Sequence, residues 1–196
     1  TALFGGGDIS GINKYGSLYI GDFQINNGGL GMGAYRGRAS NAAYFANAAR
    51  ASIRKERKCA VKKDGTVWCW GSETAAQRCV AGSSAGGEYP EQVYTSSPST
   101  FLTGIADVQT GKGFSCALRT SGSVHCWGND YAPYGALGDG SYTSSPTPVT
   151  VTGVTGAVQV DVGWAHACAL TGQGTVACWG EGVVGQLGEG TYSSSP

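Results

Sequence analysis

Seven cysteines are the residues of this 196-residue sequence whose type and spacing best suit chemistry. Thiolates form disulfides, bind metals or act as nucleophiles. Six of the seven form three pairs with nine residues between the members: Cys59 and Cys69, Cys116 and Cys126, Cys168 and Cys178. We expect no zinc site, because no two cysteines are separated by two residues and both histidines, His125 and His166, lie beside these pairs. The spacing therefore favours disulfides over metal binding.

A β-hairpin in each of three similar segments would bring the paired cysteines together. The segments are KCAVKKDGTVWCWG (58–71), SCALRTSGSVHCWG (115–128) and ACALTGQGTVACWG (167–180). Pairing Cys116 with Cys126 centres a glycine-containing turn on Ser121 and places Leu118 opposite Val124. Directly opposed residues lie close enough for a disulfide, and each bridge contributes about 2–3 kcal/mol at most. Three such bridges imply an oxidising compartment.

The seventh cysteine, Cys79, stands outside this pattern. It can bridge to another chain, bind a partner or remain a free thiol. It lies in the most divergent segment of the chain, RCVAGSSAGGEYPEQ (78–92). These alternatives stay open.

Four repeats of roughly 50 residues organise the chain. YGALGDGSYTSSP (134–146) matches VGQLGEGTYSSSP (184–196), and LTGIADVQTG (102–111) matches VTGAVQVDVG (154–163). A weaker copy, GGGDISGINKYGSLYIGD, spans 5–22. We therefore expect a single repeat domain over 1–196, with a degenerate unit at 1–48, units at 49–104 and 105–156, and a truncated unit at 157–196.

The composition agrees with an all-β fold and argues against several classes of protein. The 34 glycines indicate many tight turns, and 41% hydrophobic residues argue against disorder. Zero net charge and 13% charged residues argue against a strongly basic nucleic-acid binder. The apolar runs are too short for a membrane-spanning helix.

Repeated antiparallel units of this size are typical of β-propeller blades. We expect about four four-stranded blades, forming a partial propeller or one that other chains complete. Because each blade buries its faces only against its neighbours, repeated large apolar residues should form the core between blades. The residues predicted for this core are Leu30, Leu137, Leu187, Trp70, Trp127 and Trp179. The Ala-rich segment 41–53 fits a helix or a strand about equally.

The combined motifs resemble the regulator of chromosome condensation repeat, and GWAHACALTGQGTVACWGEGVVGQLGEG (163–190) matches it best. The resemblance implies blades of a seven-bladed propeller, and members with paired cysteines are similar to secreted microbial and invertebrate proteins. The chain departs from the family where the histidine two residues before the first cysteine survives only as His166. Four units cannot close a seven-bladed ring. We therefore expect a larger protein, a ring completed by other chains, or open edges paired with something else.

Two surface features have a functional and a simpler interpretation. A basic cluster suits an anionic partner, but we favour an ordinary solvated face; it comprises Arg54, Lys55, Arg57, Lys58, Lys62 and Lys63. Three YTSSP-like tracts suit O-glycosylation in a secreted protein, or simple turn chemistry. Their hydroxyl residues are Thr95, Ser96, Ser97, Thr143, Ser144, Ser145, Ser193, Ser194 and Ser195.

The motifs that resemble enzyme sites lack their required context. GSSAG (82–86) would make Ser84 a nucleophile, but no strand–turn–helix pattern surrounds it. GEGVVG (180–185) matches a dinucleotide-binding fingerprint without the helix that must follow. His125 and His166 suit local hydrogen bonds better than acid–base chemistry. We expect no catalysis, no cofactor and no metal.

The sequence favours a non-enzymatic extracellular or cell-surface propeller with a structural or adhesive role. Its expected partners are other protein chains, through self-assembly or completion of the propeller, and glycans; we expect neither nucleic acid nor a membrane span. One alternative is a secreted inhibitor or ligand-binding propeller, for which Trp68 and Trp164 are the unrepeated aromatic candidates. A second is guanine-nucleotide exchange on Ran with chromatin binding, as in the family's namesake. The paired cysteines argue against a nuclear protein.

Overall fold

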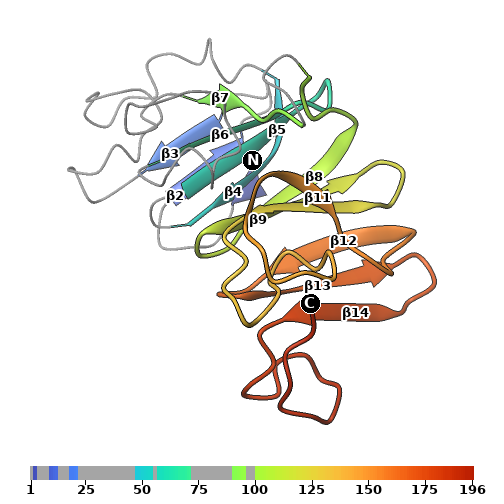
Figure 1. Ribbon diagram of the computed structural model, residues 1–196. Coiled ribbons are helices and arrows are strands. Elements are labelled where there is room, and N and C mark those ends of the chain that lie inside the picture. The colour runs from blue at the N-terminus through green and yellow to red at the C-terminus, as the bar shows by residue number, and fades with distance from the viewer. Residues whose placement is uncertain are drawn as a thin grey trace.

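Stacked antiparallel β-sheets make up the computed structural model of the chain (Figure 1). It describes the backbone of 2–3, 9–12 and 18–21, and the residues 47–54, 57–71, 90–95 and 100–196. All regular elements in these ranges are strands. Within the same ranges, no helix is long and apolar enough to cross a membrane.

The strands form four sheets. The first has the order β1-β2-β3, with strands Ala2–Leu3, Ile9–Ile12 and Leu18–Gly21. The second has the order β4-β5-β6-β7, with strands Ala48–Ile53, Arg57–Lys62, Val67–Gly71 and Glu91–Gln92. The third has the order β8-β9-β10-β11, with strands Ile105–Thr110, Phe114–Arg119, Val124–Gly128 and Ser145–Thr150. The fourth has the order β12-β13-β14, with strands Ala157–Val162, His166–Thr171 and Val176–Gly180.

The hairpin predicted around the second cysteine pair is present in β9 and β10. Cys116 lies opposite Cys126, and Leu118 lies opposite Val124. Gly122 occupies the turn with a φ of +85°, a conformation that residues with a Cβ adopt at a cost. The segment 41–53, for which helix and strand were left open, contributes strand β4 from Ala48, and its earlier residues lie outside the described ones.

The first strands of three successive sheets, β4, β8 and β12, lie side by side at the inner edge of the stack. Each begins its sheet, and the chain then moves outward through the hairpin that follows. Polar residues alternate with buried apolar ones along them, as in β12, where Asp161 is exposed between buried Val160 and Val162. Ends of strands from different sheets therefore meet at this inner edge, where connecting loops can form a common surface.

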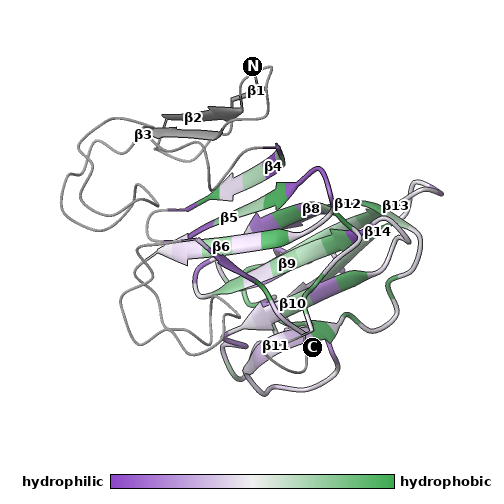
Figure 2. Ribbon diagram, turned by 90° about the horizontal axis from the view of Figure 1, so that it is seen from above, coloured by the Kyte–Doolittle hydropathy of each residue, from purple (hydrophilic) through white to green (hydrophobic). Residues whose placement is uncertain are grey.

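Two apolar cores separate the successive sheets, as the predicted inter-blade packing requires. Apolar residues concentrate on the strands of the stack (Figure 2). The core between the second and third sheets contains the first cysteine pair, Val61 and Val67 together with Trp127. The core between the third and fourth sheets contains the second pair and Trp179. Because side chains alternate along a strand, cysteines face the following sheet and Trp127 faces the preceding one.

The edge of the fourth sheet differs from the same position in the two sheets before it. Val67 and Val124 are fully buried, and their carbonyls accept hydrogen bonds from Val93 and Val151, both 2.9 Å long. The equivalent Val176, on β14, is 61% exposed.

Candidate functional site

The structure joins the three cysteine pairs that the sequence pattern singles out. The S–S distances are 2.11, 2.14 and 2.10 Å, and the Cα atoms of each pair are 4.0–4.1 Å apart. The first two disulfides are buried between sheets. The third, between β13 and β14, is half-buried. Cys79 lies outside the described residues.

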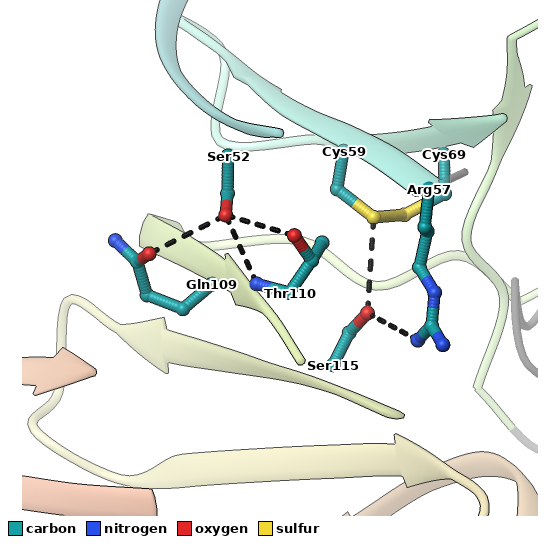
Figure 3. Close-up of a disulfide and its surroundings, with 7 residues drawn as sticks. All are labelled: Ser52, Arg57, Cys59, Cys69, Gln109, Thr110 and Ser115. Atoms are coloured by element: carbon teal, nitrogen blue, oxygen red, sulfur yellow. Dashed lines mark hydrogen bonds between the residues drawn. A yellow bond between two sulfur atoms is a disulfide. The ribbon is translucent and has the colours of Figure 1, made fainter. Parts of the chain in front are cut away.

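Polar groups link the second and third sheets around the first disulfide (Figure 3). The Oγ of Ser115 lies 4.0 Å from the Sγ of Cys59 and accepts a 3.0 Å hydrogen bond from the guanidinium of Arg57. Next to it, Ser52 Oγ lies 3.0 Å from Thr110 Oγ1 and accepts a 3.0 Å bond from the Thr110 N–H. These bonds fix the position of the third sheet against the second.

The basic cluster does not form one surface patch, which corrects both interpretations of it. Arg57 and Lys58 are fully buried, because β5 is covered on both faces. Lys62 places its ammonium 4.3 Å from the ring centroid of Trp68. Lys63 is exposed in the hairpin turn, and Lys55 lies outside the described residues. The basic residues between 54 and 63, which the sequence predicted to form a solvated face, are thus divided between the core and the surface.

Arg54, the remaining described member, connects three sheets. Its Nε donates to the carbonyl of Thr110 and its Nη2 to the carbonyl of Val162, each at 3.1 Å. Thr110 ends β8 and Val162 ends β12, while Arg54 follows β4. One guanidinium therefore spans the ends of three inner strands, a role that the sequence did not indicate.

An exposed aromatic group lies at the same end of the inner strands. The rings of Tyr131 and Trp164 have centroids 5.1 Å apart and are tilted by 32°. The ammonium of Lys112 lies 4.4 Å from the centroid of the Trp164 ring, and the hydroxyl of Tyr131 donates to the Lys112 carbonyl. Trp164 is 48% exposed. The sequence singled out Trp164 but missed its two neighbours.

The other aromatic candidate, Trp68, is less available for a ligand. It is half-buried, its indole N–H donates to Thr66 Oγ1 at 3.1 Å, and Lys62 lies against its ring. Trp164 is therefore the better placed of the two for contact with a partner.

Three titratable side chains in the described part of the chain, Asp107, Asp130 and His125, have local hydrogen-bond partners. Burial raises the pKa of Asp107, although Gln109 donates a 3.1 Å hydrogen bond to its carboxylate. Burial also raises the pKa of Asp130, whose Oδ1 accepts from the Leu137 N–H at 2.7 Å. Burial, then the charge of Arg119, lowers the pKa of His125. Across the described ranges no three His, Cys, Asp or Glu side chains gather as a metal site would require.

The predicted core residues occupy different environments. Leu137 and Trp179 pack between the third and fourth sheets, and the Trp179 indole N–H donates to the Ala136 carbonyl at 3.1 Å. Trp70 packs with alanines of its own sheet. Leu187 is buried in the C-terminal loop. Leu30 lies outside the described residues.

Described residues of all three Ser/Thr tracts make local hydrogen bonds. Ser144 Oγ accepts from the Asp130 N–H at 3.0 Å, and Ser194 Oγ accepts from the Gly182 N–H at 3.2 Å. The hydroxyls of Thr95 and Ser145 donate to the carbonyls of Thr100 and Thr147. Thr143 and Ser193 are exposed, whereas Ser195 pairs with Gly180 through the backbone.

Ser96 and Ser97, and Ser84 of the GSSAG motif at 82–86, lie outside the described ranges. GEGVVG (180–185) forms turns after β14.

Stacked antiparallel sheets, three of which place their first strand at a common edge, define this chain as a β-propeller protein. A family model described as "Regulator of chromosome condensation (RCC1) repeat" matches residues 105–133 and 157–186, and a second with the same description matches 121–170. The chain therefore carries regulator of chromosome condensation repeats, in a disulfide-containing form.

Known proteins resemble this chain in sequence or in fold. The human E3 ubiquitin-protein ligase HERC2 is 35% identical over 133 residues, which are 67% of this chain and 3% of the ligase. The crystal structure of human WBSCR16 superposes with a TM-score of 0.76 at 22% identity, covering 96% of this chain and 49% of that one. Yeast RCC1 (Prp20), crystallised with Kap60 bound, gives 0.75 at 19% identity, covering 99% and 46%. The chain thus spans about half of each solved propeller.

Proposed function

We propose that this chain is a non-enzymatic, extracellular β-propeller module that binds other protein chains and has a structural or adhesive role in a larger surface assembly. The observation that carries the proposal is the disulfide across the hairpin of each of three successive sheets. Disulfides persist in oxidising compartments and are rare in the cytosol and nucleus. The same bridges argue against a Ran-type exchange factor.

Binding rather than catalysis agrees with what the described side chains do. The carboxylates of Asp107 and Asp130 and the ring of His125 form hydrogen bonds inside their own sheet or its loops. Solved propellers with this fold include one bound to a protein, Kap60.

A secreted inhibitor or ligand-binding propeller is a second candidate, which the exposed Trp164 favours. Both candidates bind a partner through the propeller surface, and they differ in whether the partner's activity is blocked.

The first test of the extracellular proposal is peptide mass mapping of the protein purified from its native source without reduction. We expect peptides linked through Cys59–Cys69, Cys116–Cys126 and Cys168–Cys178, and a reduced, alkylated sample as the control should lack them. The partner of Cys79, if it has one, appears in the same experiment. Seven free thiols in the native protein would rule out the extracellular scaffold.

A further inference from the structure

The tips of successive loops line one end of the propeller. The loops Gly111–Phe114 and Gly163–His166 each connect an inner strand to the next strand of its sheet, and each is closed by a 2.8 Å bond from the glycine N–H to the carbonyl three residues on. Lys112 and Trp164 are therefore equivalent residues in adjacent sheets. Arg54 begins the corresponding loop of the second sheet, where its N–H bonds to the Arg57 carbonyl.

Trp164 is not required by the packing of the blade. It is 48% exposed and belongs to neither buried core. The equivalent position in the preceding sheet holds Lys112, which is exposed, so the loop forms equally well around a polar side chain. A tryptophan kept nearly half in water is the residue type that most often anchors a protein interface.

The aromatic group is held in place before any partner arrives. Tyr131 is fixed through its hydroxyl to the Lys112 carbonyl, and its ring lies against Trp164. Lys112 in turn places its ammonium over the Trp164 ring. Side chains already ordered in the free protein lose less entropy on binding, so more of their contact energy appears as affinity.

One cation, Lys112, lies directly against the aromatic group, and a second, Arg54, lies at the same end of the inner strands. Arg54 is exposed and bonded to the carbonyl of Val162, two residues before Trp164, and Lys112 lies against the indole itself. Asp130, in the adjoining loop, is fully buried. Two carboxylates of the described residues lie close to these cations along the chain: Glu181, whose N–H bonds to the Ala165 carbonyl, and Asp161, whose Oδ1 accepts from the Val162 N–H.

We propose that Trp164, Tyr131, Lys112 and Arg54 form a docking surface for an acidic segment of a partner protein, an inference that rests on the proposed protein-binding function. The indole and phenol rings supply the apolar anchor. Lys112 and Arg54 attract the carboxylates of the segment and set its direction across the two sheets.

The test is selection from a random dodecapeptide library displayed on phage, with the immobilised 196-residue chain as bait. Selected peptides are then synthesised and their affinities measured by fluorescence polarisation. We expect them to be rich in Asp and Glu and to bind Trp164→Ala at least about tenfold more weakly. Lys112→Gln should weaken binding several-fold, with a smaller loss at high salt. Phe101→Ala is the matched control, because Phe101 is also an exposed aromatic but precedes β8 at the opposite end of the blade.

Thermal melts must show that each variant is folded before its affinity is compared. Peptides without acidic residues, or peptides that bind Trp164→Ala as tightly as the wild type, would overturn the docking surface while leaving a protein-binding module. No selected peptide, together with Trp164-dependent binding on a glycan array, would overturn both the surface and the proposed protein-binding function.

Discussion

His125 shows how one side chain can couple the stability of this fold to pH. It is half-buried on β10, between β9 and β11. Its Nε2 accepts a 3.1 Å bond from the Nε of Arg119 and lies 3.4 Å from Ser123 Oγ, while its Nδ1 lies 3.3 Å from Thr150 Oγ1. Accepting from a guanidinium requires a neutral ring with its proton on Nδ1. Burial and the charge of Arg119 accordingly lower its pKa.

We predict that protonation at His125 lowers the free energy of unfolding as the pH falls from 7.5 to 5. The unfolded chain has an ordinary histidine pKa of about 6.5, so it takes up a proton before the folded protein does. The loss begins as the pH falls through that value and continues until it reaches the lower pKa of the folded state. Urea unfolding at a series of pH values measures this slope. His125→Gln should reduce it, and Arg119→Gln should reduce it in part; an unchanged slope in both variants would contradict the assignment.

At the scale of the element, the hairpin turns combine a local requirement with a packing requirement. Gly65, Gly122 and Gly174 occupy the same turn position with φ of +79°, +85° and +84°. A Cβ on Gly122 would lie 2.7 Å from the Cα of Gly156 in the next sheet, whereas nothing lies within 4 Å of a Cβ on Gly174. The turn sets the backbone conformation in all three hairpins, and the neighbouring sheet adds a steric limit only where it is close.

Gly122→Ala and Gly174→Ala form a matched pair that separates these two requirements. Gly174→Ala should cost about 1 kcal/mol, the strain of a left-handed residue with a Cβ. Gly122→Ala should cost about 1–3 kcal/mol more, because the added methyl group also pushes the third sheet away from the fourth. Urea unfolding of both variants gives the difference directly. Equal losses would show that the sheets separate freely at this contact.

At the scale of the whole molecule, the Arg54 side chain forms hydrogen bonds to two other sheets at once. Its guanidinium donates to the ends of β8 and β12, which lie 56 and 108 residues away in the sequence. Sheets in a propeller otherwise contact only their immediate neighbours, so stability is close to a sum of adjacent interfaces. A side chain that spans three sheets adds a link beyond nearest neighbours.

We predict that Arg54→Gln lowers the free energy of unfolding by about 1–2 kcal/mol, the value of charged hydrogen bonds that are partly open to water. Arg54→Lys should lose most of the same stability, because an ammonium on a flexible chain cannot reach both carbonyls in the fixed geometry of a guanidinium. Arg50→Gln is the control from β4, the strand that ends just before Arg54; Arg50 bonds to the carbonyl of its neighbour Ala49, and its charge acts on Asp107 of the third sheet. Hydrogen exchange in β12 should rise in both Arg54 variants, and unchanged exchange there would contradict the link.

The loops show where prediction from the sequence reached its limit at the candidate site. The repeat alignment placed the disulfide hairpins and pointed to Trp164 as an unrepeated aromatic. It also aligns Lys112 with Trp164, which was a usable signal for neighbouring loop tips. Nothing in the alignment indicates Tyr131, because its ring reaches Trp164 from a different loop, 33 positions earlier in the chain.

Local pattern determined the hairpins of this protein, and the stacking of sheets decided the fate of its charged and aromatic side chains. Cys116 and Cys126 meet because a glycine turn and strand alternation act within ten residues, so the sequence alone predicts their register. Arg57 is buried because Ser115, 58 residues further on, lies on the sheet packed against it. Burial depends on what covers a strand, and in a stack of sheets that cover comes from residues distant in the sequence.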